Sequence, residues 1–325
     1  MSIMANDYRM GFGDISAQRI LEKHKNHPLL LIKREFSFER FRERLEGLYS
    51  DNGRPGFDPV KMLLLLALGK SQNLSDLRLE FEISANLLYR EFCGFRIDEA
   101  TPDHSTISRF RDRIMPVWDD IWADFLDWLE DKEYIGDSLV IVDSTAIQAR
   151  TRFRKEKSDK DENGKTDYSG QTDPDARHGH KSAKKPFYGY KGHIATDGNS
   201  DFIVAVETTG GEKFDGDMLP AIVHKIRYLP CAVTGDKAYN SAKNRLFLWS
   251  QGVQDKTIPK VRRVGRPPNA HKTRKRIERV FSVIKEKFGL KRTRFFGGLK
   301  VSFEFGLSAF AFNLVNLLTI RGSPV

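Results

Sequence analysis

Cysteine is scarce in this sequence, with only Cys93 and Cys231 among 325 residues and no Cys-x-x-Cys pair. Two isolated cysteines exclude a disulfide framework and a cysteine-based zinc site, and they are typical of a reducing cytosol. The opening MSIMANDYRMGFG has no basic segment followed by an apolar run, so we expect no secretory signal. We therefore predict a cytoplasmic protein.

Long hydrophobic runs are also missing. The two most apolar stretches are VKMLLLLALG from Val60 and FGLSAFAFNLVNLLTI from Phe305, and both are shorter than the roughly 20 residues that span a bilayer. The second also carries Asn313 and Asn316, one helical turn apart. We predict two buried core helices and no membrane partner.

One region lacks negative charge. Between Gln254 and Lys300 there are 16 Lys or Arg residues against three acids, a net charge of +13, whereas the whole chain carries +10. Basic charge concentrated in this way is the electrostatic footprint of a polyanionic partner, most often nucleic acid. An anionic membrane surface would also accept it, but no amphipathic anchor or lipidation motif accompanies the basic segment.

The N-terminal part of the chain, residues 1–132, is predicted to be all-helical, because segments such as SFERFRERLEGLYS repeat apolar residues at helical spacing. In TPDHSTISRFRDRI, Asp103 or a neighbouring serine can cap a new helix. Its basic residues Arg109, Arg111 and Arg113 would face outward. Two short helices followed by this basic helix are compatible with a helix-turn-helix DNA reader, although a small helical bundle has the same pattern.

Residues 136–320 are predicted to form an α/β domain. DSLVIVDSTAI is a buried strand by its aliphatic run, and GYKGHIATDG and DFIVAVETTG are two strands joined at Gly198 and Asn199, a hairpin signal. CAVTGDKAY and KTIPKV supply two more strands, with helices between them. Between about residues 148 and 186 the chain is polar, and we predict an irregular basic insertion there.

Two aspartates are predicted to lie where aliphatic strands end. Asp143 follows the run LVIV, and Asp236 follows the strand in CAVTG. Asp is depleted in strand interiors, and the ligands of open α/β sheets gather at the carboxyl ends of strands. Taken alone, each of these residues is more often a turn or capping residue, and that alternative stays open.

The basic helix RKRIERVFSVIKEKFG supplies a third acid. At about 100° per residue, one apolar stripe is formed by Ile277, Phe281, Ile284 and Phe288. Arg274, Glu278 and Lys285 fall on a second stripe beside it. Packing the apolar stripe on the sheet would turn Glu278 toward Asp143 and Asp236. Three converging carboxylates repel unless cations bridge them, and hard oxygen ligands suit a pair of Mg²⁺ or Mn²⁺ ions.

The three acids give the sequence its resemblance to a known family. Asp143 in IVDSTAI, Asp236 in TGDKAYN and Glu278 in RKRIERVFSVIK resemble the acids of the DDE transposases of bacterial insertion sequences, specifically the IS-four/IS-five group. GYKGHIATD, PDHSTISRFRDR and the spacing from Asp236 to Tyr239 are also similar to this group. The resemblance covers roughly residues 40–320.

The signature around the third acid of that group is Tyr-x2-Arg-x3-Glu-x6-Lys. Arg274, Glu278 and Lys285 match it, and His271 stands at the position of the tyrosine. The basic residues Arg274 and Lys285 are predicted to hold DNA phosphates beside the metal ions.

The resemblance implies a ribonuclease-H-like catalytic domain, a mixed sheet flanked by helices over residues 136–320, preceded by an all-helical DNA-binding domain over residues 1–132. It implies two Mg²⁺ (or Mn²⁺) ions held by the three acids, and DNA contacts that we assign to Arg274, Lys285, Arg109 and Arg113. The implied reaction is cleavage at the terminal inverted repeats of an element followed by strand transfer into target DNA, by a homodimer acting on nucleoid DNA.

Three alternatives stay open at this point. The chain could be a domesticated descendant that only binds DNA, without catalysis. It could be a ribonuclease-H-like nuclease that cuts DNA without strand transfer. It could also be a basic globular protein whose acids only cap structural elements.

Overall fold

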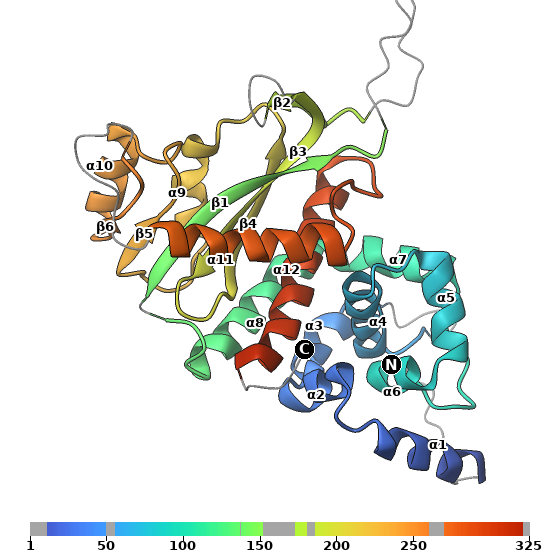
Figure 1. Ribbon diagram of the computed structural model, residues 1–325. Helices are drawn as coiled ribbons and strands as arrows, with labels where there is room; N and C mark the ends of the chain where they lie inside the picture. Colours follow the sequence, from blue (N-terminus) through green and yellow to red (C-terminus); the bar gives the residue numbers. More distant parts are fainter. Residues whose placement is uncertain are drawn as a thin grey trace, which may run out of the picture.

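The computed structural model describes residues 12–49, 56–136, 138–151, 173–180, 186–259 and 270–320, without the side chains of residues 12–14 and 270–274. Within these ranges a mixed sheet stands beside a group of helices, and the two share the long helix α12 (Gly298–Ile320) (Figure 1). A mixed sheet accompanied by helices is the architecture that the sequence predicted.

Helices precede the sheet in the chain, as the helical spacing predicted. They are α1 (Phe12–Lys23), α2 (Pro28–Glu35), η1 (Phe38–Phe41), α3 (Arg42–Glu46), α4 (Pro59–Ser71), α5 (Asp76–Ala85), α6 (Leu87–Cys93), α7 (His104–Ile114), η2 (Met115–Val117) and α8 (Trp118–Asp131). The predicted cap of α7 is confirmed, because Asp103 Oδ1 accepts the Thr106 N–H at 2.6 Å. Helix α4 is apolar on all sides and is buried along almost its whole length.

The sheet follows α8 and contains both parallel and antiparallel pairs. Its strands are β1 (Leu139–Gln148), β2 (Arg177–His180), β3 (Pro186–Asp197), β4 (Ile203–Gly210), β5 (Ala232–Thr234) and β6 (Gln254–Asp255). Strand β3 pairs antiparallel with β1 on one side and with β2 and β4, end to end, on the other. Strand β5 runs parallel to both β1 and β6. The remaining helical segments are η3 (Asp215–Met218), α9 (Leu219–His224), α10 (Ala242–Ser250), α11 (Ala270–Ser282) and the π-helical turn η5 (Val283–Lys287).

The predicted hairpin between β3 and β4 is confirmed. Asp197, the last residue of β3, accepts the backbone N–H groups of Asn199 at 2.8 Å and Ser200 at 2.9 Å with the same oxygen, Oδ1. Asp201 then adopts a positive φ of 63°, and the chain enters β4. The turn is therefore built by Asx chemistry around Gly198.

Two predicted elements differ from the structure. The segment predicted as an irregular insertion contains β2, a four-residue strand that pairs only with β3. The last strand lies in Gln254–Asp255 and not in KTIPKV, because Asp255 Oδ1 accepts both the Thr257 N–H at 2.8 Å and the Thr257 hydroxyl at 2.6 Å. That local hydrogen bonding ends the regular strand at Asp255, although Lys256 N and Ile258 N still donate to Val233 O and Gly235 O.

Helix α12 packs on β4 and also on α2, α4 and α8 (Figure 1). It is long and apolar enough to cross a membrane, but 83% of that apolar window is buried in the protein, so it is a core helix. Its two asparagines face the β3–β4 hairpin: Asn313 bonds the backbone N and O of Ile203, each at 2.8 Å, and Asn316 donates to Ser200 O at 2.8 Å. The division of the chain into two domains stays a prediction, and α12 fills apolar space on both sides of it.

A buried ion pair joins α4 to α12. Lys70 Nζ donates to Glu304 Oε1 at 2.9 Å, and the two side chains are only 9% and 4% exposed. The Thr293 hydroxyl donates to the other oxygen, Oε2, at 2.7 Å. Burial lowers the pKa of Lys70, and the Glu304 carboxylate opposes that shift. This network connects the helical part of the chain to the segment that follows α11.

Candidate active site

Asp143 lies within β1 and not at its end as predicted. Strand β1 continues to Gln148 because β3 pairs with it over its whole length from Val140, whereas β5 pairs with it only as far as Ile141. Asp143 therefore sits just beyond the point where the parallel neighbour ends. It is half-buried, and its Oδ1 accepts the N–H of Ser144 at 2.8 Å.

The strand register brings Asp236 beside Asp143. Ile141 is opposite Thr234 in the parallel pair, so each aspartate lies two residues beyond a matched position. The approach persists past the paired residues, since a Cβ added at Gly235 would lie 2.9 Å from Val142 Cγ2. Neighbouring strands are about 4.8 Å apart, so the backbones at Asp143 and Asp236 lie along the same short stretch, where the pairing of β1 with β5 ends.

The turn that carries Asp236 is fixed by buried hydrogen bonds. Asp236 Oδ1 accepts the Ala238 N–H at 2.7 Å, which is the capping role left open by the sequence. Behind the turn, the side-chain amide of buried Asn244 donates to Tyr239 O and to Gly216 O, both at 2.8 Å. A Cβ at Gly216 would lie 2.3 Å from Ala238 O, so only glycine allows this close approach.

The pKa of Tyr239 is affected by three acids that lie near its side chain. Its phenol lies near Ser144, which brings the Asp236 turn close to β1. Burial raises the pKa of Tyr239 well above its usual value, and the carboxylates of Asp143, Asp215 and Asp236 raise it further. Three acids thus act on one phenol. Asp215 was not among the predicted site residues, and its only signal in the sequence is the acidic FDGD that follows the strand ETTG.

The two faces of β1 have different neighbours. Gly192 pairs with Thr145, and a Cβ on Gly192 would lie 2.5 Å from the ring of Phe305 in α12, so Asp143 shares the face covered by α12. Lys191 points to the opposite face, where its Nζ donates to Asp215 Oδ1 at 2.9 Å. Asp143 is therefore on the α12 side of the sheet, and Asp215 is on the other side.

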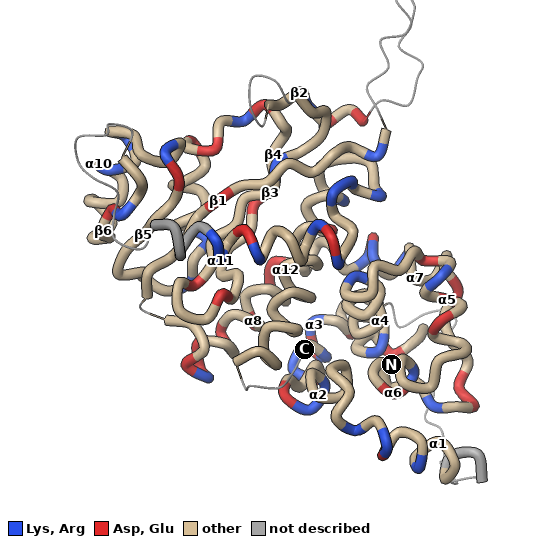
Figure 2. The backbone as a smooth tube through the Cα atoms, in the orientation of Figure 1, with Lys and Arg blue, Asp and Glu red and all other residues tan. Residues whose placement is uncertain are grey.

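Glu278 is carried by α11, which packs against β1. The helix crosses in front of β1 in Figure 1, and Figure 2 shows basic and acidic positions side by side along it. The predicted apolar stripe is buried in the structure: Ile277, Phe281, Ile284 and Phe288 are all less than 9% exposed. Glu278 is exposed on the flank of this stripe. Counted at about 100° per residue, it lies about 200° from Arg276, on the opposite flank.

Two arginines on that helix do not have the role expected of them. From the sequence, the concentrated basic charge of this segment is attributed to a polyanionic partner. Instead, Arg276 Nε and Arg279 Nη2 both donate to the carboxylate of Asp201, at 2.5 and 2.6 Å, and Arg276 also donates to Asn199 O at 2.7 Å. These contacts fasten α11 to the β3–β4 turn because Asp201, at 8% exposure, is a buried charge that requires cations.

The basic residues predicted to contact DNA lie in two places. Lys285 is half-buried in the π-helical turn at the end of α11, and the side chain of Arg274 lies outside the described residues. In α7, Arg109 and Arg113 are exposed, and Arg113 stacks on the Tyr49 ring at 4.9 Å. A role in DNA binding stays a prediction for all four.

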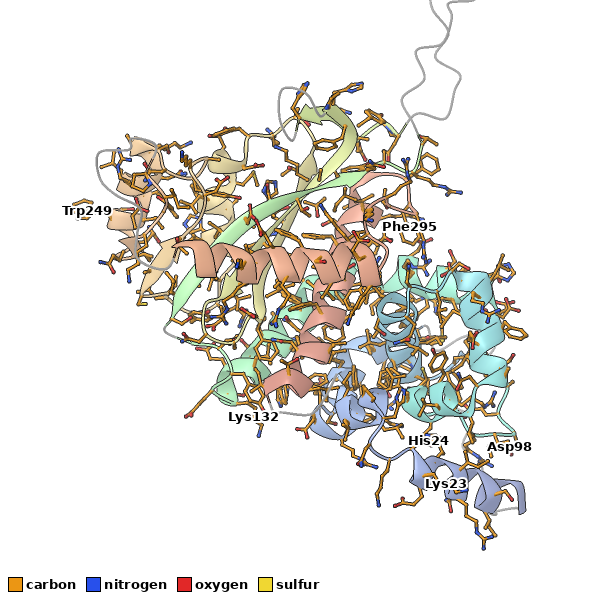
Figure 3. All side chains as sticks on the ribbon, in the orientation of Figure 1. Lys23, His24, Asp98, Lys132, Trp249 and Phe295 are labelled. Atoms are coloured by element: carbon orange, nitrogen blue, oxygen red, sulfur yellow. The ribbon has the colours of Figure 1, made fainter. Side chains whose placement is uncertain are left out.

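Arg111 was predicted to face outward and is buried instead. Its guanidinium is bidentate to Asp76 of α5 and lies 4.9 Å from the centre of the Phe295 ring. Phe295 belongs to the segment that follows α11 and comes close to α7 (Figure 3). Arg111 is buried because the segment that contains Phe295 covers it and keeps it from solvent.

The donor set suits a hard cation, although the three acids are not clustered. Among the side chains that the structure describes, no three His, Cys, Asp or Glu residues converge closely enough to hold a metal ion. Asp143 and Asp236 each follow the paired residues of β1 and β5 by two positions, and Glu278 comes from α11, which packs against β1. All three are carboxylates, and the adjacent aspartates repel each other unless a cation lies between them, which fits Mg²⁺ or Mn²⁺.

Comparisons with known proteins find matches for both the helical part of the chain and the part that contains the sheet. Residues 134–314, more than half of the chain, match the family described as "Transposase DDE domain", and residues 17–113 match "Transposase domain (DUF772)". The chain is also similar to the transposase for insertion sequence element IS1106 of Neisseria meningitidis serogroup B, with 30% identity over 153 residues. That alignment covers 42% of this chain and 49% of the relative, so the chain spans about half of the length of that curated relative.

Proposed function

Since this chain belongs to the family of DDE transposases, we propose that it transposes a DNA element, with Asp143, Asp236 and Glu278 as ligands of its catalytic metal ions. The observation that supports the proposal is the register of β1 and β5, whose last matched residues, Ile141 and Thr234, each stand two positions before one of the aspartates. Structural turn residues would not need to be adjacent, and their mutual repulsion gives a reason for a bound cation.

Each residue has a part in the proposed reaction. Two Mg²⁺ ions held by these carboxylates would activate a water or a 3′-hydroxyl and offset the charge of the leaving oxygen. Asp143 and Asp236 form a preset pair on the rigid sheet, and the exposed carboxylate of Glu278 approaches from α11 to complete the set. The fold of the matched domain fits a ribonuclease-H-like arrangement.

DNA is the partner that this family implies, and the charge distribution supports it. We propose that Lys285 and Arg274 contact the phosphates beside the metal ions, and that Arg109 and Arg113 on α7 contact the terminal inverted repeats. The helical region then acts as the DNA-binding domain. Membership of the IS-four/IS-five group, a homodimeric complex on paired ends and a cytoplasmic site of action on nucleoid DNA are further parts of the proposal.

The experiment uses the purified chain, a linear DNA carrying the element's end and a supercoiled target plasmid in Mg²⁺. Asp143→Asn, Asp236→Asn and Glu278→Gln should each lower end cleavage by more than about 100-fold, because each removes a group that stabilises the transition state. Glu286→Gln is the matched control: it lies about two turns further along, pairs with Lys291 at 2.6 Å on the surface, and should keep its activity.

The products separate the proposal from its alternatives. Joined products between the end and the plasmid support a transposase, whereas cleavage without joining indicates a nuclease. End binding with no Mg²⁺-dependent cleavage indicates a descendant that only binds DNA. Full activity in all three acid variants would show that the carboxylates serve only as caps.

A further inference from the structure

Asp201 is a buried acid that the proposed reaction does not use. It ends the β3–β4 turn with a positive φ of 63°, a backbone conformation that a non-glycine residue adopts at an energetic cost. Its side chain is 8% exposed, so its charge is largely withdrawn from water. A strained backbone and a buried charge at one residue require compensation from specific partners.

The partners both come from the helix that carries Glu278. Arg276 Nε and Arg279 Nη2 reach the two oxygens of Asp201 at 2.5 and 2.6 Å. Arg276 spans further along the turn, donating to Gly198 O and, at 2.7 Å, to Asn199 O. The fork geometry of two guanidinium groups on one carboxylate fixes direction as well as distance.

The turn that receives these arginines is itself rigid. Asp197 Oδ1 holds two of its backbone N–H groups, and Asn316 of α12 donates to Ser200 O at 2.8 Å. The turn also rests on the first residue of β1, because Gly198 N donates to Leu139 O at 2.7 Å. The pairing of Arg276 and Arg279 with Asp201 is called the clamp below. Through the turn, it fixes the position of α11 relative to β1, the strand that carries Asp143.

Arg276 lies on one flank of α11 and Glu278 on the other, about 200° away, and Arg279 lies between them on the outward side of the helix. The buried side of the helix, with Ile277 and Val280, separates the two flanks. A helix packed through apolar contacts alone can rotate about its own axis. Fastening one flank fixes this rotation, and with it the direction in which the opposite flank points. The proposed metal site needs Glu278 together with Asp143 and Asp236, and among the described side chains no three such groups already converge on a metal site. The rotation of α11 therefore decides how close the Glu278 carboxylate comes to the two aspartates.

We propose that Asp201 is a positioning residue, which sets the rotation of α11 through Arg276 and Arg279 and thereby aims Glu278 at the metal site. The part that concerns metal rests on the proposed function, and the part that concerns rotation does not. Partners that orient metal ligands are typically worth 10- to 100-fold in metal affinity or activity. Asp201→Asn, which keeps the size and the tolerance for positive φ, should raise the half-saturating Mg²⁺ concentration for end cleavage about tenfold.

Rotation is measured independently by the distance between two spin labels. One label is placed at Glu278→Cys and the other at Lys132→Cys, an exposed position at the end of α8, in a chain whose exposed Cys231 is replaced by serine. Asp201→Asn should shift or broaden the distribution of distances between the labels. Should Asp201→Asn fail to fold, Arg279→Gln removes one arm of the clamp, and Arg279→Lys should restore part of the narrow distribution.

Glu99→Gln is the matched control for general destabilisation. Glu99 binds Lys61 at 2.6 Å in the helical region, far along the chain from α11, so its loss should leave both the label distance and the Mg²⁺ dependence unchanged. An unchanged distance distribution in Asp201→Asn and Arg279→Gln would overturn the positioning role. A wild-type chain without Mg²⁺-dependent cleavage would refute the proposed function alone, and the distance measurement would still decide the role of Asp201.

Discussion

The ion pair between Lys70 and Glu304 allows a quantitative test of the packing of α4 against α12. Both side chains are less than 10% exposed, so replacing Glu304 by glutamine leaves a buried ammonium without its counter-charge. Breaking a buried pair in this way costs about 3–5 kcal/mol. An upper bound comes from the lysine itself, because neutralising a group of pKa 10.5 at pH 7 costs about 5 kcal/mol. We therefore expect Glu304→Gln to lower the free energy of unfolding by about 3–5 kcal/mol.

The sign of the pH dependence follows from Lys70. Burial lowers its pKa in the folded state, and removal of Glu304 removes the interaction that opposes that shift. The unfolded chain then binds more protons than the folded chain between the lowered value and 10.5, so stability rises with pH in that window. The loss of unfolding free energy in Glu304→Gln, relative to the parent protein, should therefore be smaller at pH 9 than at pH 7.

Urea unfolding followed by tryptophan fluorescence measures these differences. The double variant Glu304→Gln, Lys70→Met removes both charges while Gln can still accept the Thr293 hydroxyl, so it should return to within about 2 kcal/mol of the parent. The reasoning fails if Glu304→Gln costs less than about 1 kcal/mol, or if the double variant is as unstable as the sum of the two single ones.

Two other measurements test single side chains. Burial lowers the pKa of His193 to about 4, so the free energy of unfolding should fall by up to about 3 kcal/mol as pH falls from 6.5 toward 4. This pH dependence should be absent from His193→Gln. An ordinary histidine titration of His193 in NMR spectra would contradict the prediction. Arg111→Ala should lower stability by about 2 kcal/mol, because Asp76 loses its bidentate partner. Arg109→Ala should change stability by less than about 0.5 kcal/mol but weaken binding to end DNA and lower its salt dependence, and equal stability losses in the two variants would contradict the assignment.

The elements with strong local signals were predicted from the sequence. The aliphatic run before Asp143, the hairpin at Gly198 and the cap at Asp103 each depend on neighbouring residues alone, and each is present. Strand β2 gave no such signal because its residues, RHGH, are polar and it exists only through pairing with β3. Its backbone partners are supplied by tertiary structure, which a local pattern does not contain.

The candidate site shows the same division. Spacing identified the three acids and the apolar stripe of α11, and the stripe is buried. The register that aligns Asp143 with Asp236 depends on a parallel pairing between segments about 90 residues apart, which no local pattern encodes. Charge counting also failed to separate cations that face DNA from cations that hold the fold, because Arg276, Arg279 and Arg111 are distinguished only by the acids they pair with in the folded chain.

The position of α12 in the chain has a consequence for the order of events during synthesis. Domains generally fold as they leave the ribosome, from the N-terminus onward. Here the apolar surfaces of α2, α4 and β4 are covered by a helix that follows all of them in sequence. Neither the helical region nor the sheet can close its core until translation has passed residue 320 and α12 has emerged. A translation product that is interrupted between Glu278 and the end of α12 therefore carries all three acids without the complete core that would hold them in place.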